Sequence, residues 1–441
     1  MDINKIIDKL GIETNPMQKE VANEILHSGK DLIILSPTGS GKTLAYMLPL
    51  VQLLDSSKDT IQAIIIVPGR ELALQSSDVL SNMGSGFRAM PCYGGRPTMD
   101  EHRVMRQINP QIVFGTPGRL NDHIDKGNIK TDDIKYIIID EFDKCLEMGF
   151  HDEMKALLNK IPANSRKILL SATPAEEMKE QNILNSRFSI CNFLDKDEQV
   201  PERIHIYKVE SPEKDKLDSL CNLLLTLGDE SSIVFLNFRD SVERTDEFLR
   251  KKGFSTSAFH GGMEQKKRED ALYKFSNGST NIFVSTDLAS RGLDIANVNN
   301  IIHYHLPESE DGYIHRVGRT ARWDKQGKAF FILGPQESIP EYVDADIDEY
   351  SVLPEAEGKK PASPKMATIY IGKGKKDKIS KGDIVGFLCK KGGLVQDEIG
   401  KIDIKDRYCY VAITRSKLQH VIKSTQGEKI KGIRTIIEQV N

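Results

Sequence analysis

The sequence predicts an α/β protein with two doubly wound parallel sheets in tandem, followed by a small α+β domain. Two observations carry this prediction. Short β-branched segments that are apolar on both faces alternate with helical patterns along most of the chain, which is typical of parallel strands buried on both sides. After a linker rich in Pro, Lys and Glu, PEAEGKKPASPK at 354–365, the pattern becomes that of a compact basic domain.

The strand segments fall into two series separated by a polar stretch at 195–202. The first series is 31–36, 63–68, 111–116, 136–140 and 167–173, and the second is 204–209, 232–236, 255–260, 281–286, 300–304 and 328–333. In the last domain a βαββαβ order is expected, with strands at 368–372, 400–404, 408–413 and 432–437 and helices at 380–390 and 416–424. We therefore expect domains at 1–197, 203–350 and 366–441, with 354–365 as the linker.

Composition excludes several classes of protein. Of 441 residues, 39% are hydrophobic and 28% are charged, so the chain can bury cores and is not disordered as a whole. No apolar run approaches the roughly 18–20 residues of a membrane helix, and residues 1–11 lack the apolar segment of a secretory signal. Six scattered cysteines with no CxxC pair predict a reduced, cytoplasmic protein. No coiled-coil repeat is visible, so we expect a monomer.

The net charge of −3 conceals an asymmetry. Residues 366–441 contain 13 Lys, 3 Arg and 8 acidic residues, a balance of +8, whereas the other 365 residues carry −11. A basic domain attached to an acidic body indicates a polyanionic partner such as nucleic acid, although a basic surface can also serve solubility alone.

The segment Ser36–Thr43, SPTGSGKT, directly follows a strand segment and precedes a helical pattern. In this context glycines let backbone N–H groups approach phosphate oxygens, and the helix N-terminus favours their negative charge. Lys42 would reach the β- and γ-phosphates of a nucleotide, and the hydroxyl of Thr43 would bind Mg²⁺. The alternative is a chance Gly/Ser turn. The predicted ATP-binding residues of this loop are Ser36, Thr38, Gly39, Ser40, Gly41, Lys42 and Thr43.

Two adjacent carboxylates end the strand segment of YIIIDEFD, which spans Tyr136–Asp143. Ligands of parallel sheets bind at the carboxyl ends of the strands, where Asp140 could hold the Mg²⁺ of a nucleotide. Glu141 could orient and deprotonate the attacking water. Acidic pairs at strand ends are also common as solvated turns. The phosphate loop about a hundred residues earlier in the same sheet favours a site of nucleotide hydrolysis.

Seven segments resemble, in their order along the chain, the motifs of the DEAD-box RNA helicases. They are SPTGSGKT, PGRELA at Pro68–Ala73, TPGR at Thr116–Arg119, DEFD, SAT at Ser171–Thr173, STDLASRGLDI at Ser285–Ile295 and HRVGRTAR at His315–Arg322. The resemblance implies two RecA-like P-loop domains: an N-terminal ATP-binding domain and a C-terminal helicase domain. It also implies RNA-stimulated ATP hydrolysis with Mg²⁺ and local unwinding of RNA duplexes.

The resemblance also assigns roles to individual residues. Gln18 resembles the glutamine that reads the adenine edge, and Ser171 and Thr173 resemble the hydroxyl pair that couples ATP to RNA, through Asp143. In the second domain, Asp294 resembles a residue near the ribose. Arg319 and Arg322 resemble arginine fingers, which stabilise transition-state charge once the domains close. The predicted catalytic residues are therefore Glu141, Arg319, Arg322 and Lys42.

The RNA track implied by the resemblance contacts the backbone, because an unwinding motor should not read sequence. For any single arginine in it, a solvated surface charge is the alternative. The candidate contacts are Arg70, Gly94, Gly95, Arg96, Thr116, Gly118 and Arg119 in the first domain, and Arg239, Gly262, Gln265, Arg268 and Thr286 in the second.

Several positions depart from the family pattern. Phe142 replaces the usual alanine of the acidic motif, and Gly69 replaces a threonine that donates to RNA. The aromatic residue that usually precedes the adenine-reading glutamine would fall at Met1, which bears on adenine specificity rather than on hydrolysis. Phe142 and the missing upstream aromatic residue motivate an alternative, a catalytically weak RNA clamp or assembly scaffold. A DNA-directed translocase is the third hypothesis.

The histidines invite a metal interpretation but are expected to serve packing. His303 and His305 alternate along one strand without an acidic or cysteine partner at ligand spacing. His102, His123 and His151 are isolated in the sequence and are expected to be ordinary surface or packing residues.

The order and charge of residues 366–441 suit an RRM-like domain. The strand segment at 406–413, DRYCYVAI, only partly matches the aromatic string on which such domains stack bases. Two segments, TIYIGKGKKDKISKGDIVGFL and IGKIDIKDRYCYVAI, instead resemble the tail of the DbpA subgroup of DEAD-box helicases. That resemblance implies binding to a hairpin of large-subunit ribosomal RNA through basic loops, and ribosome assembly particles as partners.

The candidate RNA contacts of this domain share a basic side chain in or near a loop, and a lysine-rich solvated face is their alternative. They are Lys373, Lys375, Lys376, Lys378, Arg407 and Lys431. Together the motifs predict an ATP-dependent RNA helicase that its basic domain tethers to ribosomal RNA.

Overall fold

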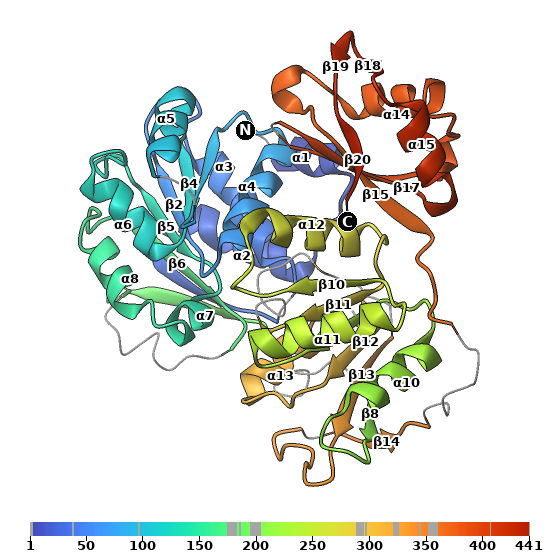
Figure 1. Cartoon of the computed structure of the whole chain (residues 1–441). Coiled ribbons are helices and arrows are strands. Elements are labelled where there is room, and N and C mark those ends of the chain that lie inside the picture. Colours follow the sequence, from blue (N-terminus) through green and yellow to red (C-terminus); the bar gives the residue numbers. More distant parts are fainter. Residues whose placement is uncertain are drawn as a thin grey trace. The chain divides into compact units, whose positions relative to one another are not determined.

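A computed structural model gives the fold of the chain (Figure 1). It describes residues 3–37, 39–95, 98–173, 183–184, 187–194, 204–287, 295, 298–320, 326–343, 345–351, 360–405 and 407–440. The chain forms two compact units that meet in sequence at Pro201 and Glu202. The first unit holds the first sheet. The second unit holds the second sheet and the tail domain, which is the name used here for residues 366–441.

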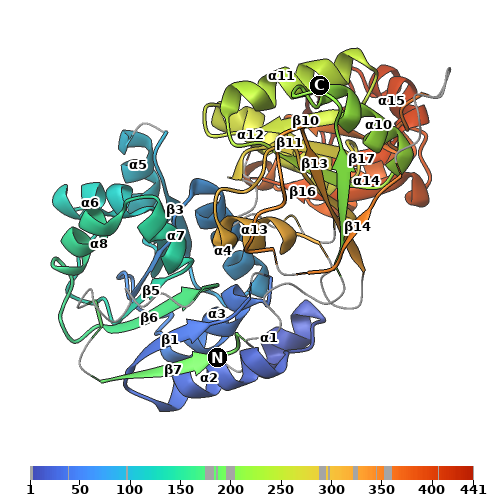
Figure 2. The same ribbon diagram turned by 90° about the horizontal axis from the view of Figure 1, so that it is seen from below.

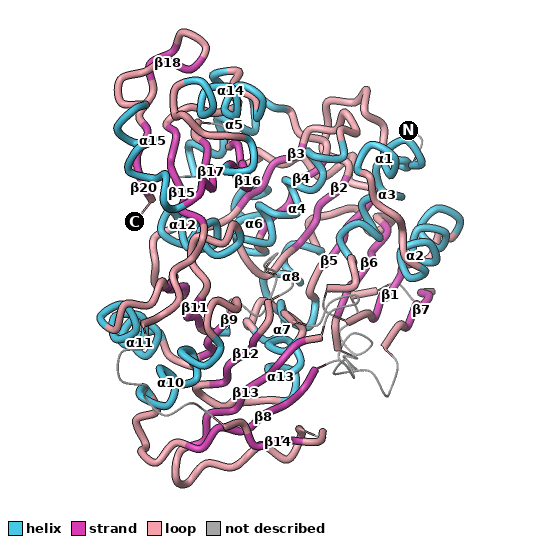
Figure 3. The backbone as a smooth tube through the Cα atoms, turned by 90° about the vertical axis from the view of Figure 1, so that its right-hand side faces the viewer, coloured by secondary structure: helices cyan, strands magenta, loops and turns pink. Residues whose placement is uncertain are grey.

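The first sheet has seven parallel strands in the order β3-β4-β2-β5-β6-β1-β7, and Figure 3 shows them side by side in this order. The five expected strands are confirmed as β1 (Asp31–Leu35), β2 (Ala63–Ile66), β4 (Ile112–Gly115), β5 (Tyr136–Ile139) and β6 (Arg166–Ser171). Two strands that the sequence did not predict are β3 (Ala89–Cys92) and β7 (Phe188–Asn192), which form the two edges. The predicted parallel architecture is therefore correct.

Alternate residues of these strands face two different layers of helices. Ile34 and Ile65 pack against α1 (Ile3–Leu10), α2 (Pro16–His27), α3 (Lys42–Leu53) and α4 (Arg70–Met83). Ile33 and Ile64 pack against α5 (Thr98–Ile108), α6 (Pro117–Asp125), α7 (Phe142–Glu147) and α8 (His151–Leu158). Figure 2 shows α2 and α7 on opposite sides of the central strands. Burial on both faces explains why these strands are apolar throughout.

The second sheet repeats this plan with the order β10-β11-β9-β12-β13-β8-β14. Its strands are β8 (Ile204–Glu210), β9 (Ser232–Phe235), β10 (Thr256–Phe259), β11 (Ile282–Ser285), β12 (Asn300–His303), β13 (Gly327–Leu333) and β14 (Ile347–Glu349). One face packs against α10 (Leu217–Leu227) and α11 (Arg239–Lys251). The other contacts α12 (Gln265–Ser276) through Phe283 and α13 (Glu310–Val317) through Phe331. The six expected strands are confirmed, and β14 was not expected.

The tail domain has the predicted βαββαβ order around an antiparallel sheet, β16-β17-β15-β20. Its elements are β15 (Met366–Ile371), η2 (Lys375–Asp377), α14 (Lys381–Lys390), η3 (Gln396–Glu398), β16 (Ile399–Ile404), β17 (Cys409–Thr414), η4 (Arg415–Lys417), α15 (Leu418–Ser424) and β20 (Ile437–Gln439). The prediction of a last strand at 432–437 is wrong. Lys431 (φ 51°) and Gly432 (φ 78°) form a turn between two short strands, β18 (Lys429–Ile430) and β19 (Ile433–Arg434), so the sheet strand begins later.

The first half of the expected linker, 354–359, lies outside the described residues, which resume at Lys360. All six cysteines are unpaired. Among the described helices, none combines the length and the apolar character that crossing a bilayer requires.

Candidate nucleotide and RNA site

The phosphate loop has the strand–loop–helix context that the sequence predicts. It leaves β1 at Ser36 and enters α3 at Lys42, with Gly39 (φ 82°) and Gly41 (φ 87°) in the left-handed conformation that glycine favours. The Lys42 amine donates to the carbonyls of Ser36 (2.7 Å) and Pro37 (2.9 Å). The amine therefore lies within the loop, where the phosphates of a nucleotide would replace these carbonyls. Thr38 lies outside the described residues.

Gln18 lies directly against this loop. Its side-chain amide donates to the carbonyl of Gly41 (3.2 Å), and the amide of Asn15 donates to the carbonyl of Ser40 (2.9 Å). Asn15 and Gln18 also cap α2 reciprocally, which fixes both side chains. A Cβ at position 41 would lie 2.4 Å from Gln18 Nε2, so this contact requires glycine. The structure thus brings Gln18 and the phosphate loop together, as their predicted roles require.

In the sheet, β6 separates β5 from β1, which leads into the phosphate loop, and Asp140 is a buried carboxylate directly after β5. It is 3% exposed, and the hydroxyl of Tyr46 on α3 donates to its Oδ2 (3.4 Å). Burial, and then the neighbouring Glu141 carboxylate, raise the pKa of Asp140 to about 7, while the Lys42 ammonium opposes the shift. A divalent cation would favour the charged carboxylate. Asp140 therefore fits a Mg²⁺ site. Tyr46, which buttresses Asp140, was missed by sequence reasoning.

Glu141 turns the chain from β5 into α7. Its backbone has φ 52° and ψ 53°, a left-handed conformation that costs a residue other than glycine roughly 1–3 kcal/mol. Its N–H donates to Asp140 Oδ1 (3.0 Å). The strained turn holds two adjacent carboxylates at the carboxyl end of the sheet, one of them buried, as a metal ligand and a general base require.

Asp143 connects the acidic motif to the SAT motif at the end of β6. The hydroxyl of Thr173 donates to Asp143 Oδ2 (3.2 Å). The hydroxyl of Ser171 donates to the carbonyl of Thr173 (2.7 Å) and accepts from its N–H (3.2 Å). All three residues are buried. The predicted coupling residues therefore form one hydrogen-bonded unit beside the nucleotide site.

Phe142, the departure within the acidic motif, is fully buried. It packs in the core between the sheet and α5–α8, together with Ile139 and Cys145. A large side chain at this position thus fills the core and does not occupy the surface where a nucleotide would bind. Its presence gives no reason to expect weak catalysis.

The predicted RNA contacts of the first domain follow β2, β3 and β4, which are adjacent in the sheet. Arg70 begins α4, and its guanidinium lies over the turn after β3, because a Cβ at Gly95 would be 2.5 Å from its Nη1. Thr116 precedes α6, and Gly118 lies in the first turn of that helix. A Cβ added at Gly118 would meet nothing within 4 Å. These residues gather at one end of the sheet, in the half away from the phosphate loop. Arg96 lies outside the described residues.

The predicted RNA contacts of the second domain also follow neighbouring strands of its sheet. Arg239 begins α11 after β9, Gly262 follows β10 and Thr286 follows β11, and these three strands are also neighbours. A Cβ at Gly262 would lie 3.5 Å from Arg239 Cδ, so these two residues are in contact. Gln265 begins α12 and donates to Glu269 (3.3 Å).

Arg268 differs from the other RNA candidates because it is only 4% exposed. Its guanidinium lies 5.1 Å from the centre of the Phe259 ring. The structure therefore places Arg268 in the interior of the second domain, and contact with RNA at this position remains a prediction.

Arg316 of the HRVGRTAR motif makes extensive contacts, and sequence reasoning missed it. It is fully buried, pairs with Asp287, and donates to the carbonyl of His305 (2.8 Å) and the side chain of Asn237 (2.8 Å). It therefore holds together the ends of β9, β11 and β12. The position of Arg316 within HRVGRTAR was the sequence signal that could have identified it. Arg319 is 2% exposed, and Asp294 and Arg322 lie outside the described residues.

His303, at the end of β12, and His305, just beyond it, serve packing and hydrogen bonding. The His303 ring stacks on Phe331 with 4.4 Å between ring centres, and burial together with the charge of Arg316 holds its pKa well below the usual range. The ring of His305 accepts from the N–H of Asn237 (3.1 Å).

Basic residues of the tail domain surround the loop between β15 and α14. Lys375, Lys376 and Lys378 are exposed there, as is Arg407 in the β16–β17 connection. Lys373 pairs with Asp377 (3.3 Å), and Lys431 pairs with Asp383 (3.0 Å). The loop lysines therefore offer the most accessible positive charge among the predicted contacts.

The tyrosines of the tail sheet are covered by α12 of the second domain, which belongs to the same compact unit. Tyr408 donates to Glu269 (2.7 Å), and Tyr410 donates to Asp270. The rings of Tyr410 and Tyr273 are 4.5 Å apart. The aromatic residues on which an RRM-like sheet could stack bases are therefore engaged within the chain, which leaves the basic loops as the exposed RNA-binding candidates.

Fold and site together define a nucleotide-dependent motor of two parallel-sheet domains with a basic tail. The sequence matches the DEAD/DEAH box helicase family over residues 15–181. It matches the helicase conserved C-terminal domain over 215–324 and the DbpA RNA binding domain over 368–439.

Individual relatives agree with these matches. ATP-dependent RNA helicase DbpA of Bacillus subtilis is 31% identical over 481 aligned positions, covering 100% of this chain and 98% of the relative. DbpA of Escherichia coli is 32% identical over 434 positions, covering 97% and 94%. A structure of S. cerevisiae Dbp5 bound to RNA and ADP BeF3 has a TM-score of 0.71 at 26% identity, covering 79% of this chain and 93% of that one. The chain belongs to the DEAD-box ATP-dependent RNA helicases, in a group whose tail is a DbpA RNA-binding domain.

Proposed function

We propose that this helicase unwinds short duplexes on large-subunit ribosomal RNA, to which its tail domain tethers it during assembly of that subunit. The observation that carries the proposal is the tail, a domain with a balance of +8 whose loop lysines are exposed while its sheet face is covered. A tether raises the effective concentration of nearby duplexes around the motor without any new contact to them.

In the proposed hydrolysis step, Thr43 and Asp140 would hold the Mg²⁺ of ATP, which would neutralise phosphate charge, and Lys42 would bind the phosphates. Glu141 orients the attacking water and accepts its proton. Gln18 reads the adenine. Asp294, Arg319 and Arg322 complete the site from the second domain.

In this proposal, RNA stimulates hydrolysis by closing the two domains. A single strand bound by the loops after β2–β4 and β9–β11 would bring the arginine fingers to the nucleotide, so hydrolysis depends on RNA. The hydrogen-bonded unit of Asp143, Ser171 and Thr173 lies beside the predicted nucleotide site. It would transmit the state of the nucleotide to the half of the sheet where the RNA candidates follow β2, β3 and β4. We infer that the helicase works as a monomer in the cytoplasm on ribosome assembly particles. Its six unpaired cysteines suit a reduced compartment.

Strand release from two RNA duplexes tests the tether. One duplex is attached to a hairpin of large-subunit ribosomal RNA, and the other has the same sequence without the hairpin. Replacing the loop lysines Lys375, Lys376 and Lys378 with Gln should slow release from the attached duplex by about tenfold or more, because phosphate contacts are lost. Release from the free duplex should not change.

A matched control removes the same charge elsewhere in the tail, at Lys390, Lys391 and Lys423, which are also exposed. It should leave both rates unchanged. Equal release of the two duplexes by the unaltered helicase would contradict the tether, and release that does not need ATP would support an RNA clamp instead.

A further inference from the structure

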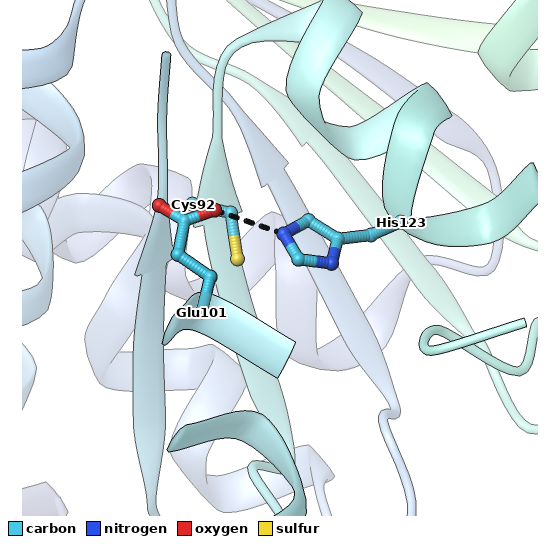
Figure 4. Close-up of side chains that lie close together, drawn as sticks. All are labelled: Cys92, Glu101 and His123. Carbon is cyan, nitrogen blue, oxygen red and sulfur yellow. Dashed lines mark hydrogen bonds and ion pairs between the residues drawn. The ribbon is translucent and has the colours of Figure 1, made fainter. Parts of the chain in front are cut away.

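Three buried side chains of the first domain face one another close to the half of its sheet where the predicted RNA contacts follow β2, β3 and β4. Cys92 ends β3, Glu101 lies on α5 and His123 lies on α6, and Figure 4 shows them converging. One potential ligand atom of each lies within 4.8 Å of the others. The expectation that His123 is an ordinary isolated histidine is therefore incomplete, since its Nε2 lies 2.9 Å from Glu101 Oε2.

Thiol, carboxylate and imidazole are metal ligands by type, but their surroundings disfavour a metal centre. The Glu101 carboxylate already accepts from the Tyr93 N–H (3.4 Å) and lies 3.6 Å from Arg119 Nε. A guanidinium at this distance repels a second cation. Burial raises the pKa of the Cys92 thiol well above its usual value, which makes the thiolate that metals bind costlier to form.

Through Glu101, this cluster also contacts Arg119 of the TPGR motif, a predicted RNA contact. The Arg119 side chain is 11% exposed and that of Glu101 is 6% exposed, so the ion pair is mostly shielded from water. Asp122 Oδ2 lies 3.9 Å from Arg119 Nη1, which places carboxylates near two nitrogens of the guanidinium. His123 in turn provides the polar partner that a buried carboxylate requires.

We propose that Glu101, held in place by His123, is a positioning residue that orients the Arg119 guanidinium toward the RNA backbone. This inference rests on the proposed role of Arg119 in RNA binding. An arginine side chain has many rotamers, and fixing its Nε side to a buried carboxylate leaves the outer nitrogens in one orientation, so less entropy is lost when phosphate binds. Glu101 itself does not touch RNA.

The test is the affinity of the full-length helicase for a generic single-stranded RNA, measured across a range of salt concentrations. Arg119→Gln should weaken binding by about tenfold and reduce the slope of log Kd against log salt by about one. Glu101→Gln should weaken binding by about threefold or more, even though it removes a negative charge near RNA, while kcat at saturating RNA and KM for ATP stay unchanged. In the double variant, Glu101→Gln should add no further loss.

Two controls separate positioning from charge and from stability. Asp122→Asn removes a negative charge near the same arginine and should leave RNA affinity unchanged or higher. Glu101→Asp keeps the charge but withdraws the carboxylate by one methylene, so it should weaken RNA binding, and it serves in place of Glu101→Gln if that variant does not fold.

Several outcomes would overturn the proposal. If Glu101→Gln binds RNA as tightly as the unaltered protein, or more tightly, while Arg119→Gln binds weakly, Glu101 only screens charge and the RNA role of Arg119 stands. If Arg119→Gln has no effect, the RNA role of Arg119 fails and the positioning of that arginine fails with it. Stoichiometric Zn²⁺ binding that depends on Cys92 would assign the cluster to a metal.

Discussion

At the scale of single residues, Asp140 and Glu141 are neighbours in sequence but differ in their surroundings. Asp140 is buried, contacts Tyr46 and has a raised pKa, whereas Glu141 occupies a strained left-handed turn. The different environments suit the two carboxylates to the different tasks proposed for them, a metal ligand and a base.

Replacing the base should separate hydrolysis from binding. Glu141→Gln keeps the size of the side chain but removes the proton acceptor, so kcat for ATP should fall by about a hundredfold or more while RNA affinity is retained. Steady-state ATP hydrolysis and equilibrium RNA binding measure the two effects. Glu147→Gln on α7, whose partner is Lys144, is the matched control and should hydrolyse ATP normally. Hydrolysis by Glu141→Gln within tenfold of the unaltered rate would show that another group is the base.

Phe142 should matter for stability. Its side chain is fully buried among α5–α8 and the sheet, so Phe142→Ala should destabilise the first domain by about 3–5 kcal/mol. The loss of stability is measured by unfolding the full chain in urea, with proteolysis as the readout of the unfolded fraction. Met148→Ala at a side chain that is 43% exposed should change stability by less than about 0.5 kcal/mol. Equal effects of both changes would mean that Phe142 does not pack as described.

At the scale of elements, the sequence predicted the strands whose burial leaves a strong pattern. Central strands such as β2, AIII, are apolar at every position because helices cover both faces. The edge strand β7 is only partly buried and β3 contains Pro91, so neither carries that pattern. The last tail strand was misplaced because the turn at Lys431 and Gly432 interrupts a segment that is otherwise strand-like.

Two tyrosine hydroxyls hydrogen-bond the tail sheet to α12. A double variant, Tyr408→Phe with Tyr410→Phe, keeps the rings but removes both bonds to carboxylates, each worth roughly 1.5–3 kcal/mol. Amide hydrogen exchange in α12 and β17 of the full chain should become faster. Tyr370→Phe on the same face should not change it, because the Tyr370 contact with the Lys266 amine uses the ring. Equal exchange in all three proteins would contradict a role for the hydroxyls.

The same contacts should be sensitive to high pH. Burial, followed by the nearby Glu269 and Asp270, raises the pKa values of Tyr408 and Tyr410. A tyrosine released from the interface would ionise near pH 10. The docked state holds these protons more tightly, so docking should weaken as pH rises above about 10 and remain unchanged below it. Hydrogen exchange of α12, corrected for intrinsic rates, measures this effect.

At the scale of the whole molecule, the candidate nucleotide residues and the candidate RNA contacts of the first domain lie in different halves of its sheet. The nucleotide candidates follow β1, β5 and β6, whereas the RNA candidates follow β2, β3 and β4. Contiguous motifs made this division predictable, since each motif follows one strand. The network of Glu101, His123 and Arg119 was not predictable, because its members lie on two helices and no local pattern joins them.

This chain should hydrolyse ATP in response to RNA, and most strongly in response to the RNA that its tail is proposed to recognise. Steady-state ATP hydrolysis by the full-length protein tests it most directly, without RNA, with a generic single strand and with large-subunit ribosomal RNA. We expect slow hydrolysis without RNA, faster hydrolysis with the generic strand, and the fastest with ribosomal RNA at the same nucleotide concentration. Hydrolysis that is equally fast with and without RNA, or absent under all three conditions, would contradict the account.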